Sequence, residues 1–255
     1  MTAALTAQGV SVSFGGVHAV VDVDLEVPEG RLVGLIGPNG AGKTTFIDAI
    51  TGFVRCRGRV ALGGTDLSRL APHERARSGL ARTWQASELF DDLTVAENLA
   101  VATERPSLWS TTKEVLWKGP ANGAAVRDAL ALVGMEEAAE TLPAQLSQGD
   151  RKLVGVARAL AAAPQVVCLD EPAAGLDSAE SEQLGRRLRE VVDRGTATLL
   201  VDHDMSLVLS VCHWIVVLEF GKVIATGTPD DVRRNRRVVE AYLGSAGAER
   251  VAEQL

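Results

Sequence analysis

The stretch "RLVGLIGPNGAGKTTFIDAI", residues 31–50, passes from a short apolar run through a glycine-rich segment into a helical one. Gly37 and Gly42 enclose four residues, and Lys43 and Thr44 follow directly. This spacing, after a strand and at the start of a helix, matches the phosphate-binding loop pattern in full. Glycines let backbone N–H groups turn inward around a phosphate, and the helix N-terminus adds positive potential. The stretch predicts a site where Lys43 bridges β- and γ-phosphates and the Thr44 hydroxyl binds Mg²⁺; a glycine-rich turn without a ligand is the alternative.

A second apolar run, "QVVCLDEP" at residues 165–172, ends in two carboxylates. Its continuous apolar residues are typical of a strand buried on both faces of a parallel sheet. Asp170, at the end of such a strand and beside a phosphate loop, would hold Mg²⁺ directly or through water. Glu171 would then orient or deprotonate the attacking water as a general base. Taken alone, such a pair would fit a solvated strand end equally well, and the phosphate loop upstream favours the nucleotide site.

Strands and helices alternate at both ends of the chain and enclose a mostly helical middle. The first thirty residues alternate apolar and polar side chains up to a Pro-Glu-Gly turn, which predicts antiparallel strands. "ATLLVDHD" at residues 197–204 predicts another buried parallel strand, and "WIVVLEFGKVIATG" predicts a hairpin that turns near Gly221. Residues 178–195 predict a helix with serine at its start and glycine at its end. Between Pro72 and Pro164, apolar residues recur three and four apart, as in helices.

These elements predict an α/β protein whose sheet core carries a helical subdomain. The 255 residues, 46% of them hydrophobic, suffice for one large domain with a sizeable core. We expect a single domain over residues 1–255, with the α/β core and a β subdomain at 1–85 and 160–255 and the helical subdomain at about 86–159.

Composition excludes several classes of protein. The 26 basic and 33 acidic side chains give a net charge of −7, which argues against a general nucleic-acid binder. Cys56, Cys168 and Cys212 lie far apart and are odd in number, so no disulfide framework or zinc spacing follows. The apolar runs are too short to span a bilayer, and the first residues lack the pattern of a signal peptide. We therefore expect a soluble, cytoplasmic protein.

Five ordered motifs resemble those of ATP-binding cassette (ABC) ATPases. They are Gly37 to Thr45, Gln85 in "ARTWQASELF", "LSQGD" at residues 146–150, "LDEPAAGLD" and His203 in "LLVDHDM". The resemblance spans nearly the whole chain and implies a P-loop NTPase (RecA-like) core with an antiparallel β subdomain and an inserted helical subdomain. Longer stretches, among them "GLARTWQASELFDDLTVAENLAV" and "VVEAYLG", resemble the ATPase subunits of branched-chain amino acid importers. The urea and short-amide relatives of that group are similar, so related small polar solutes stay open as cargo.

The resemblance implies ATP and Mg²⁺ as cofactors and assigns roles by motif. The ATP-binding residues of the phosphate loop would be Gly37, Pro38, Asn39, Gly40, Ala41, Gly42, Lys43, Thr44 and Thr45. The metal would be held by Thr44, Gln85 and Asp170, and the catalytic residues would be Glu171, His203 and Gln85. Phe14 would stack on adenine; its alternative is a core phenylalanine in an early strand. Ser147 and Gly149 would approach the ATP of a second subunit, and Asp177 would lie in the loop that contacts that subunit.

His203 by itself is weak evidence, since a histidine at a strand end is usually a structural donor. In an extended chain, Asp202 and Asp204 would point away from His203, so a three-ligand metal cluster is not expected. The basic run from Arg233 to Arg237 and the segment "PHERAR" around His73 are interpreted as solvated helix faces.

"LSQGD" departs from the family's Leu-Ser-Gly-Gly-Gln at Gln148 and Asp150. Ser147, Gly149 and a helix N-terminus, which a γ-phosphate needs, are all present. Ser147 and Asp150 form an S-x-x-D pair that would cap the helix, but the added carboxylate would lie near a partner's ATP. The signature therefore lowers the expected turnover and leaves the fold and the nucleotide unchanged.

Three functions follow from these expectations. The first is the ATPase of an importer, in which two such chains, identical or sister subunits, sandwich two Mg-ATP molecules and drive separate permease subunits fed by a solute-binding protein. Such a chain would be cytoplasmic and peripheral on the inner face of the cell membrane, and would bind no nucleic acid. The second is a nucleotide-binding regulatory subunit with weak turnover. The third, a soluble ATPase that acts on DNA or ribosomes, is disfavoured by the single cassette and the acidic balance.

Overall fold

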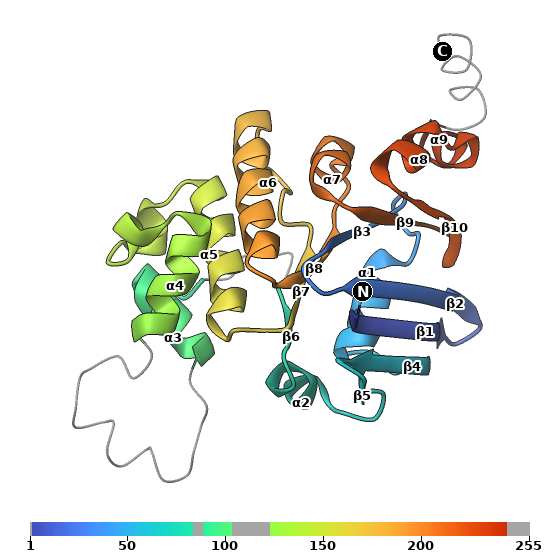
Figure 1. Ribbon diagram of the computed structural model, residues 1–255, viewed down its shortest axis with the longest axis horizontal. Coiled ribbons are helices and arrows are strands. Elements are labelled where there is room, and N and C mark those ends of the chain that lie inside the picture. Colours follow the sequence, from blue (N-terminus) through green and yellow to red (C-terminus); the bar gives the residue numbers. More distant parts are fainter. Residues whose placement is uncertain (1, 84–88, 104–122, 244–255) are drawn as a thin grey trace.

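The computed structural model describes residues 2–83, 89–103 and 123–243 (Figure 1). Its strands are β1 (Ala3–Phe14), β2 (Val17–Pro28), β3 (Leu32–Ile36), β4 (Arg57–Leu62), β5 (Thr65–Asp66), β6 (Leu80–Arg82), β7 (Val166–Asp170), β8 (Ala197–Val201), β9 (Trp214–Glu219) and β10 (Lys222–Gly227). Its α-helices are α1 (Lys43–Thr51), α2 (Pro72–Arg77), α3 (Val95–Thr103), α4 (Gly123–Val133), α5 (Gln148–Ala161), α6 (Ser178–Asp193), α7 (Met205–Val211), α8 (Pro229–Arg234) and α9 (Arg236–Leu243). Two 3₁₀ turns, Glu136–Ala138 and Pro143–Gln145, precede α5.

The larger sheet has six strands in the order β10-β9-β3-β8-β7-β6. β8 lies between β3 and β7 and is parallel to both, and every residue of these three strands is buried. The predicted parallel strands and the hairpin of β9 and β10 are confirmed. Val201 of β8 is paired with Leu35 on one side and with Asp170 on the other, so these strand ends lie at the same edge of the sheet. This edge carries the phosphate loop and both carboxylate-bearing turns.

The smaller sheet is antiparallel, in the order β2-β1-β4-β5, as the alternation in the first thirty residues predicts for β1 and β2. Helix α1 lies between the two sheets, because Phe46, Ile47 and Ile50 on α1 are buried in one core with side chains of β1, β2, β3 and β8. The helix that starts at the phosphate loop is therefore held on both sides by apolar packing.

Helices α3, α4 and α5 pack against one another beside the large sheet (Figure 1). They confirm the predicted helical middle, with one difference. β6 is a strand of three residues that pairs in parallel with β7. Three residues are too few to show a period of two, so the sequence pattern could not reveal this edge strand.

The predicted helix at residues 178–195 forms as α6, which ends two residues before Gly195. Its cap, however, is Asp177, whose Oδ1 accepts the backbone N–H of Glu180 at 2.9 Å. Among the described residues, none of the helices is long and apolar enough to cross a membrane.

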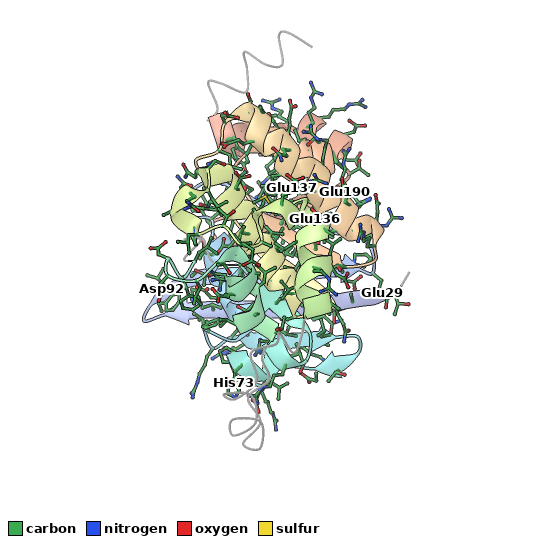
Figure 2. All side chains as sticks on the ribbon, turned by 90° about the vertical axis from the view of Figure 1, so that its left-hand side faces the viewer. Glu29, His73, Asp92, Glu136, Glu137 and Glu190 are labelled. Carbon is green, nitrogen blue, oxygen red and sulfur yellow. The ribbon has the colours of Figure 1, made fainter. Side chains whose placement is uncertain are left out.

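The interpretation of "PHERAR" as a solvated face is wrong for one residue. His73 lies on the surface, as Figure 2 shows, but Arg75 is only 3% exposed. Its guanidinium donates to the carbonyls of Ala49 and Ile50, at the C-terminal end of α1, at 2.9 and 2.7 Å. Further donations reach the backbone carbonyls of Leu70 and Ser68 at 3.0 and 3.2 Å. Arg75 thus anchors the far end of the helix that begins at the phosphate loop.

Candidate functional site

The phosphate loop joins β3 to α1 and requires glycine at two positions by its geometry. Gly37 has φ +151°, and a Cβ there would lie 2.1 Å from the carbonyl oxygen of Leu218. Gly42 has φ +101°, and a Cβ there would lie 2.4 Å from the carbonyl oxygen of Ala19. At Gly40, with φ +79°, a Cβ would meet nothing within 4 Å. The loop therefore packs tightly at both ends and is open in its middle, as a backbone cradle for phosphate requires.

Neighbouring strands hold this loop in place. The Gly221 N–H, in the turn between β9 and β10, donates to the Ala41 carbonyl at 2.9 Å. The Gly221 carbonyl in turn accepts the Val21 N–H at 2.8 Å, which ties β2 to the same turn. Helix α1 starts at Lys43 without a side-chain cap, so backbone N–H groups of its first turn are left for a ligand.

Lys43 is buried, with Nζ 2.7 Å from the Gly37 carbonyl oxygen and 3.1 Å from that of Pro38. Burial lowers the pKa of its ammonium group, and Glu171, Asp170 and Asp202 oppose that shift. The charges of three carboxylates therefore act on the lysine of the phosphate loop. The Thr44 side chain is exposed, and Thr45 is half-buried.

Phe14 ends β1 and is 53% exposed, so the alternative of a core phenylalanine is wrong. It is paired with Val17, the first residue of β2. Two residues further on, the Ala19 carbonyl borders Gly42 of the phosphate loop. Phe14 thus ends the strand that pairs with β2, and β2 is the strand whose backbone borders the phosphate loop.

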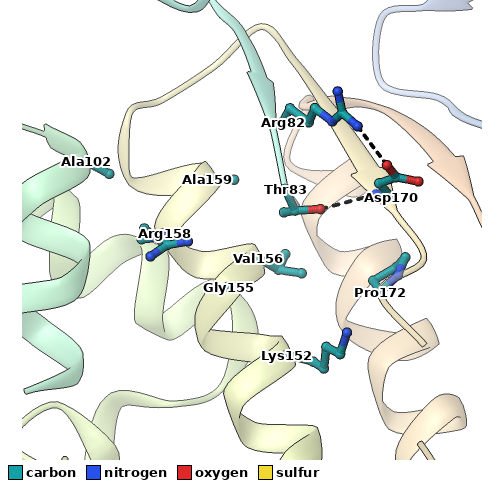
Figure 3. A pocket seen from close by; sticks show the side chains of 10 residues that line it. All are labelled: Arg82, Thr83, Ala102, Lys152, Gly155, Val156, Arg158, Ala159, Asp170 and Pro172. Carbon is teal, nitrogen blue, oxygen red and sulfur yellow. Dashed lines mark hydrogen bonds and ion pairs between the residues drawn. The ribbon is translucent and has the colours of Figure 1, made fainter. Parts of the chain in front are cut away.

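Asp170 ends β7 and is buried, and its carboxylate receives a hydrogen bond from Arg82 at the end of β6 (Figure 3). The distance from Arg82 Nη2 to Asp170 Oδ2 is 2.8 Å. Burial raises the pKa of Asp170, and the hydrogen bond and charge of Arg82 lower it. No described residue donates a hydrogen bond to the other oxygen, Oδ1. A carboxylate oxygen and the Thr44 hydroxyl are oxygen ligands of the kind Mg²⁺ prefers, so these residues fit a magnesium ion.

Glu171, the next residue, has φ +48°, and its N–H donates to the Val201 carbonyl at 2.7 Å. A left-handed backbone at a residue other than glycine is uncommon and strained. β7 therefore ends abruptly at Asp170, and the half-buried Glu171 side chain follows in a turn rather than along the sheet.

A cavity of about 200 Å³ lies between the ends of β6 and β7 and one face of α5. Figure 3 shows Lys152 of α5 near the turn that follows Asp170. Burial lowers the pKa of Lys152, and the charges of Asp202 and Glu171 oppose that shift. The charges of these two carboxylates thus act on a lysine of helix α5.

Asp202 and His203 follow β8 at the same edge of the sheet. Asp202 is fully buried; its two oxygens accept the backbone N–H groups of Ala173 at 3.0 Å and Asp204 at 2.9 Å. His203 is exposed, and its Nδ1 lies 3.6 Å from Asp202 Oδ1. The expectation that Asp202 points away from His203 is therefore wrong, because the chain is no longer extended once β8 ends at Val201.

Asp204 has a structural role as the cap of α7. Its Oδ1 accepts the N–H groups of Ser206 and Leu207 at 2.9 and 3.1 Å, and its Oδ2 accepts the Ser181 hydroxyl at 2.8 Å. Within residues 2–83, 89–103 and 123–243 there is no group of three His, Cys, Asp or Glu side chains that could hold a metal ion.

Ser147 caps α5 through the predicted pair with Asp150. The Ser147 hydroxyl oxygen accepts the Asp150 N–H at 3.1 Å and donates its proton to Asp150 Oδ2 at 2.9 Å. Gly149 is buried against α6, where a Cβ would lie 2.8 Å from Glu180 Oε1. Because Glu180 shares its capping box with Asp177, the start of α5 and the exposed Asp177 belong to one surface.

The predicted site residues therefore form two groups. The phosphate loop, Asp170, Glu171 and His203 gather at one edge of the large sheet, whereas Ser147, Gly149 and Asp177 gather where α5 and α6 begin. No hydrogen bond among the described residues joins the second group to the phosphate loop. Gln85 lies outside the described residues.

The sequence patterns missed three residues of this region: Arg82, Asp202 as an anchor, and Tyr242 on α9. The Tyr242 hydroxyl is buried near the phosphate loop, at the Gly37 N–H. Burial raises its pKa to about 12, against the opposing influence of the Gly37 N–H. Buried polar side chains of this kind follow no sequence period, and no signal in the chain pointed to them.

Comparisons with known proteins agree with this geometry. The ABC transporter family model matches residues 20–174, and a model described as branched-chain amino acid ATP-binding cassette transporter matches residues 222–248. The branched-chain amino acid transport ATP-binding protein BraF of Pseudomonas aeruginosa is 38% identical over 95% of this chain and 98% of its own length. The lipopolysaccharide export ATP-binding protein LptB of Haemophilus influenzae is 36% identical over 94% of this chain and 97% of its own length.

Solved structures of ATP-binding cassettes are also similar to this chain. An ATP-binding cassette of an ABC transporter in its ADP conformation superposes with a TM-score of 0.84 at 28% identity, over 96% of this chain and 100% of that one. A nucleotide-free cassette gives a TM-score of 0.83 at 28% identity, over 94% of this chain and 98% of that one. With a phosphate loop, two carboxylates that follow β7 at the same edge of the sheet and a full-length match in sequence and fold, the chain belongs to the ATP-binding ATPase subunits of ABC transporters.

Proposed function

We propose that this ABC ATPase energises the uptake of branched-chain amino acids, or of related small polar solutes, through separate permease subunits. The observation that carries the cargo class is the match of residues 222–248 to the branched-chain model. Relatives named for branched-chain amino acid transport and for lipopolysaccharide export are almost equally identical to the chain. The motifs shared by all cassettes therefore do not distinguish cargo, and the C-terminal segment supports the importer.

ATP would bind with its phosphates in the loop from Gly37 to Thr45 and its adenine on the exposed ring of Phe14. Lys43 would exchange its bonds to the Gly37 and Pro38 carbonyls for bonds to the β- and γ-phosphates. Thr44, Asp170 and Gln85 would hold Mg²⁺, which supplies positive charge to the phosphate oxygens when bound.

Glu171 would act as the base that orients and deprotonates the attacking water, and His203 would contact the γ-phosphate. The strained backbone of Glu171 directs its side chain out of the sheet, and Asp202 holds the turns that carry Glu171 and His203 together through the Ala173 and Asp204 N–H groups. Both groups would therefore face a γ-phosphate at the end of β3.

Ser147, Gly149 and Asp177 would act on the ATP of a second ABC ATPase subunit, identical or a sister chain. Their place on a surface of their own, where α5 and α6 begin, supports this arrangement. The segment from Leu89 to Leu93, in which Phe90 is 48% exposed, would contact the permeases. The permeases would hold the chain at the inner face of the membrane and would receive solute from a binding protein.

The proposed activity is tested by phosphate release from the purified chain. We expect ATP hydrolysis that Lys43→Ala abolishes, because the mutation removes the cation nearest the phosphates while α1 remains intact. Uptake of radiolabelled leucine into vesicles that contain the chain and its permeases would test the cargo. ATP hydrolysis without leucine uptake would contradict branched-chain amino acids as the cargo and leave the ATPase standing.

A second candidate function is a regulatory subunit that binds ATP but hydrolyses it slowly. The observation that favours it is the hydrogen bond from the Ser147 hydroxyl to Asp150 Oδ2, since a hydroxyl engaged in this way is not free to donate to a partner's γ-phosphate. A lack of hydrolysis by the purified chain, restored by a sister ATPase with an intact signature, would support this candidate.

Replacing Asp150 by Gln is expected to leave the fold unchanged and to preserve or raise ATP hydrolysis by up to about tenfold, a change of about 1.4 kcal/mol in the barrier. The substitution removes a negative charge near the partner's ATP and releases the Ser147 proton. Steady-state ATPase rates measure the effect, with Glu137→Gln, an exposed change in the 3₁₀ turn before α5, as control. A large loss of activity would mean that Asp150 has a catalytic role of its own.

A further inference from the structure

We propose that Arg82 is a positioning residue for the metal centre, which fixes Asp170 at the end of β7 against helix α1, the helix that carries Thr44. This inference rests on the proposed function, because it concerns the two residues that would hold Mg²⁺. It assigns to Arg82 a role in how those ligands are placed and none in binding the nucleotide itself.

The Arg82 guanidinium binds two carboxylates on different elements. Nη2 lies 2.8 Å from Asp170 Oδ2 on β7, and Nη1 forms an ion pair with Asp48 Oδ1 on α1. Nη1 also lies 3.4 Å from the Thr51 hydroxyl, one turn further along α1. The Arg82 side chain is only 6% exposed, and its guanidinium lies 5.9 Å from the centre of the Phe53 ring. The planar fork thus joins the strand end to the helix in a site largely shielded from water.

The proposed metal ligands depend on this junction. Thr44 lies in the first turn of α1 and Asp170 at the end of β7, so their separation depends on how α1 is held against the sheet. Arg82 is bound to both elements at once, and its partner on α1, Asp48, lies one turn of helix after Thr44. A change that released either carboxylate would let the two ligands move relative to each other.

Arg82 also orients the Asp170 carboxylate while it engages one of the two carboxylate oxygens. Of the two Asp170 oxygens, Arg82 binds only Oδ2, and Oδ1 receives no hydrogen bond from a described residue. The Thr83 hydroxyl accepts the backbone N–H of Asp170 at 3.2 Å. One oxygen is therefore held by arginine and the other is left for a metal ion, as in metal sites where a residue outside the ligand set orients a ligand.

The test compares nucleotide affinity with and without Mg²⁺. The probe is a fluorescent ATP analogue bound to the full chain with Glu171→Gln, so that hydrolysis does not interfere. Each variant is titrated once in excess Mg²⁺ and once in EDTA. Arg82→Lys keeps a positive charge but cannot reach both carboxylates, so we expect the gain in affinity due to Mg²⁺ to fall by about 10- to 100-fold, the usual effect of losing a residue that orients a metal ligand. Affinity in EDTA should stay within about twofold of the parent.

Asp48→Asn is the second variant, because it breaks the other arm and leaves Arg82 and Asp170 in place. Asp48→Asn should also reduce the gain in nucleotide affinity that Mg²⁺ provides. The double variant should reduce this gain by less than the two single effects added together. Arg77→Lys, on the exposed face of α2, is the control and should change nothing.

The outcomes separate this inference from the proposed function. A parent chain that fails to bind the analogue would overturn both. A parent that binds, with an unchanged Mg²⁺ gain in Arg82→Lys and Asp48→Asn, would overturn the role of Arg82 alone, even if the variants melt at lower temperature. A reduced gain in both variants, with affinity in EDTA retained, supports it.

Discussion

Glu171→Gln is expected to lower ATP hydrolysis by about 10²- to 10⁴-fold, the contribution of a positioned general base. The change keeps the shape of the side chain and removes its ability to accept the proton of water. The backbone of Glu171, with φ +48° and its N–H bonded to the Val201 carbonyl, does not depend on the carboxylate, so the fold should persist. Phosphate release at saturating Mg-ATP measures the loss, and binding of a fluorescent ATP analogue should be retained.

The matched control for this prediction is Glu182→Gln, the same change at an exposed position of α6. It should leave the rate within about twofold of the parent, as expected for the substitution of an exposed side chain that makes no contact with the phosphate loop. Equal rates for Glu171→Gln and the parent would sink the assignment of the base. If only a complex with a sister subunit hydrolyses ATP, the comparison is made in that complex, with the mutation in this chain alone.

The second large effect is expected for stability. Arg75→Met should destabilise the protein by about 3 kcal/mol, because it leaves buried carbonyl oxygens that a charged donor now satisfies. The affected carbonyls are those of Ala49 and Ile50, at the C-terminal end of α1, and of Ser68 and Leu70. A cation at a helix C-terminus also complements the helix dipole, and methionine lacks that charge.

The measurement is thermal unfolding of the nucleotide-free chain, where about 3 kcal/mol corresponds to a fall of about 6–12 °C in a protein of this size. Arg77→Met, two residues along the same helix and exposed, should shift the midpoint by less than about 2 °C, since surface changes usually cost below about 0.5 kcal/mol. Equal midpoints for the two variants would show that the carbonyls find other donors and that Arg75 is not an anchor.

Local patterns were sufficient for those parts of the protein whose chemistry is contiguous in the chain. Gly37, Gly42 and Lys43 specify a strand, a loop and a helix by themselves, because left-handed glycines and a capless helix start leave backbone N–H groups free for phosphate. The carboxylates of Asp170 and Glu171 follow a run of buried residues that only a central strand accommodates. The Ser147 and Asp150 cap forms as the S-x-x-D spacing predicts.

Residues that act through distant partners could not be found in this way. Arg82, Arg75 and Asp202 look like ordinary charged residues in the sequence, and each is buried because the fold brings its partners to it. The same applies to the error at Asp202, whose orientation toward His203 depends on where β8 ends.

The sequence by itself predicted the phosphate loop and the strand that ends in Asp170 and Glu171, because each rests on spacing within a few consecutive residues. The order of five such motifs along the chain pointed to the family and, through it, to the two-sheet architecture. The tertiary structure decided which charges support those groups. A buried arginine is tolerated only where carboxylates or carbonyls from other elements solvate it, and that condition depends on how α1, β6 and β7 pack together.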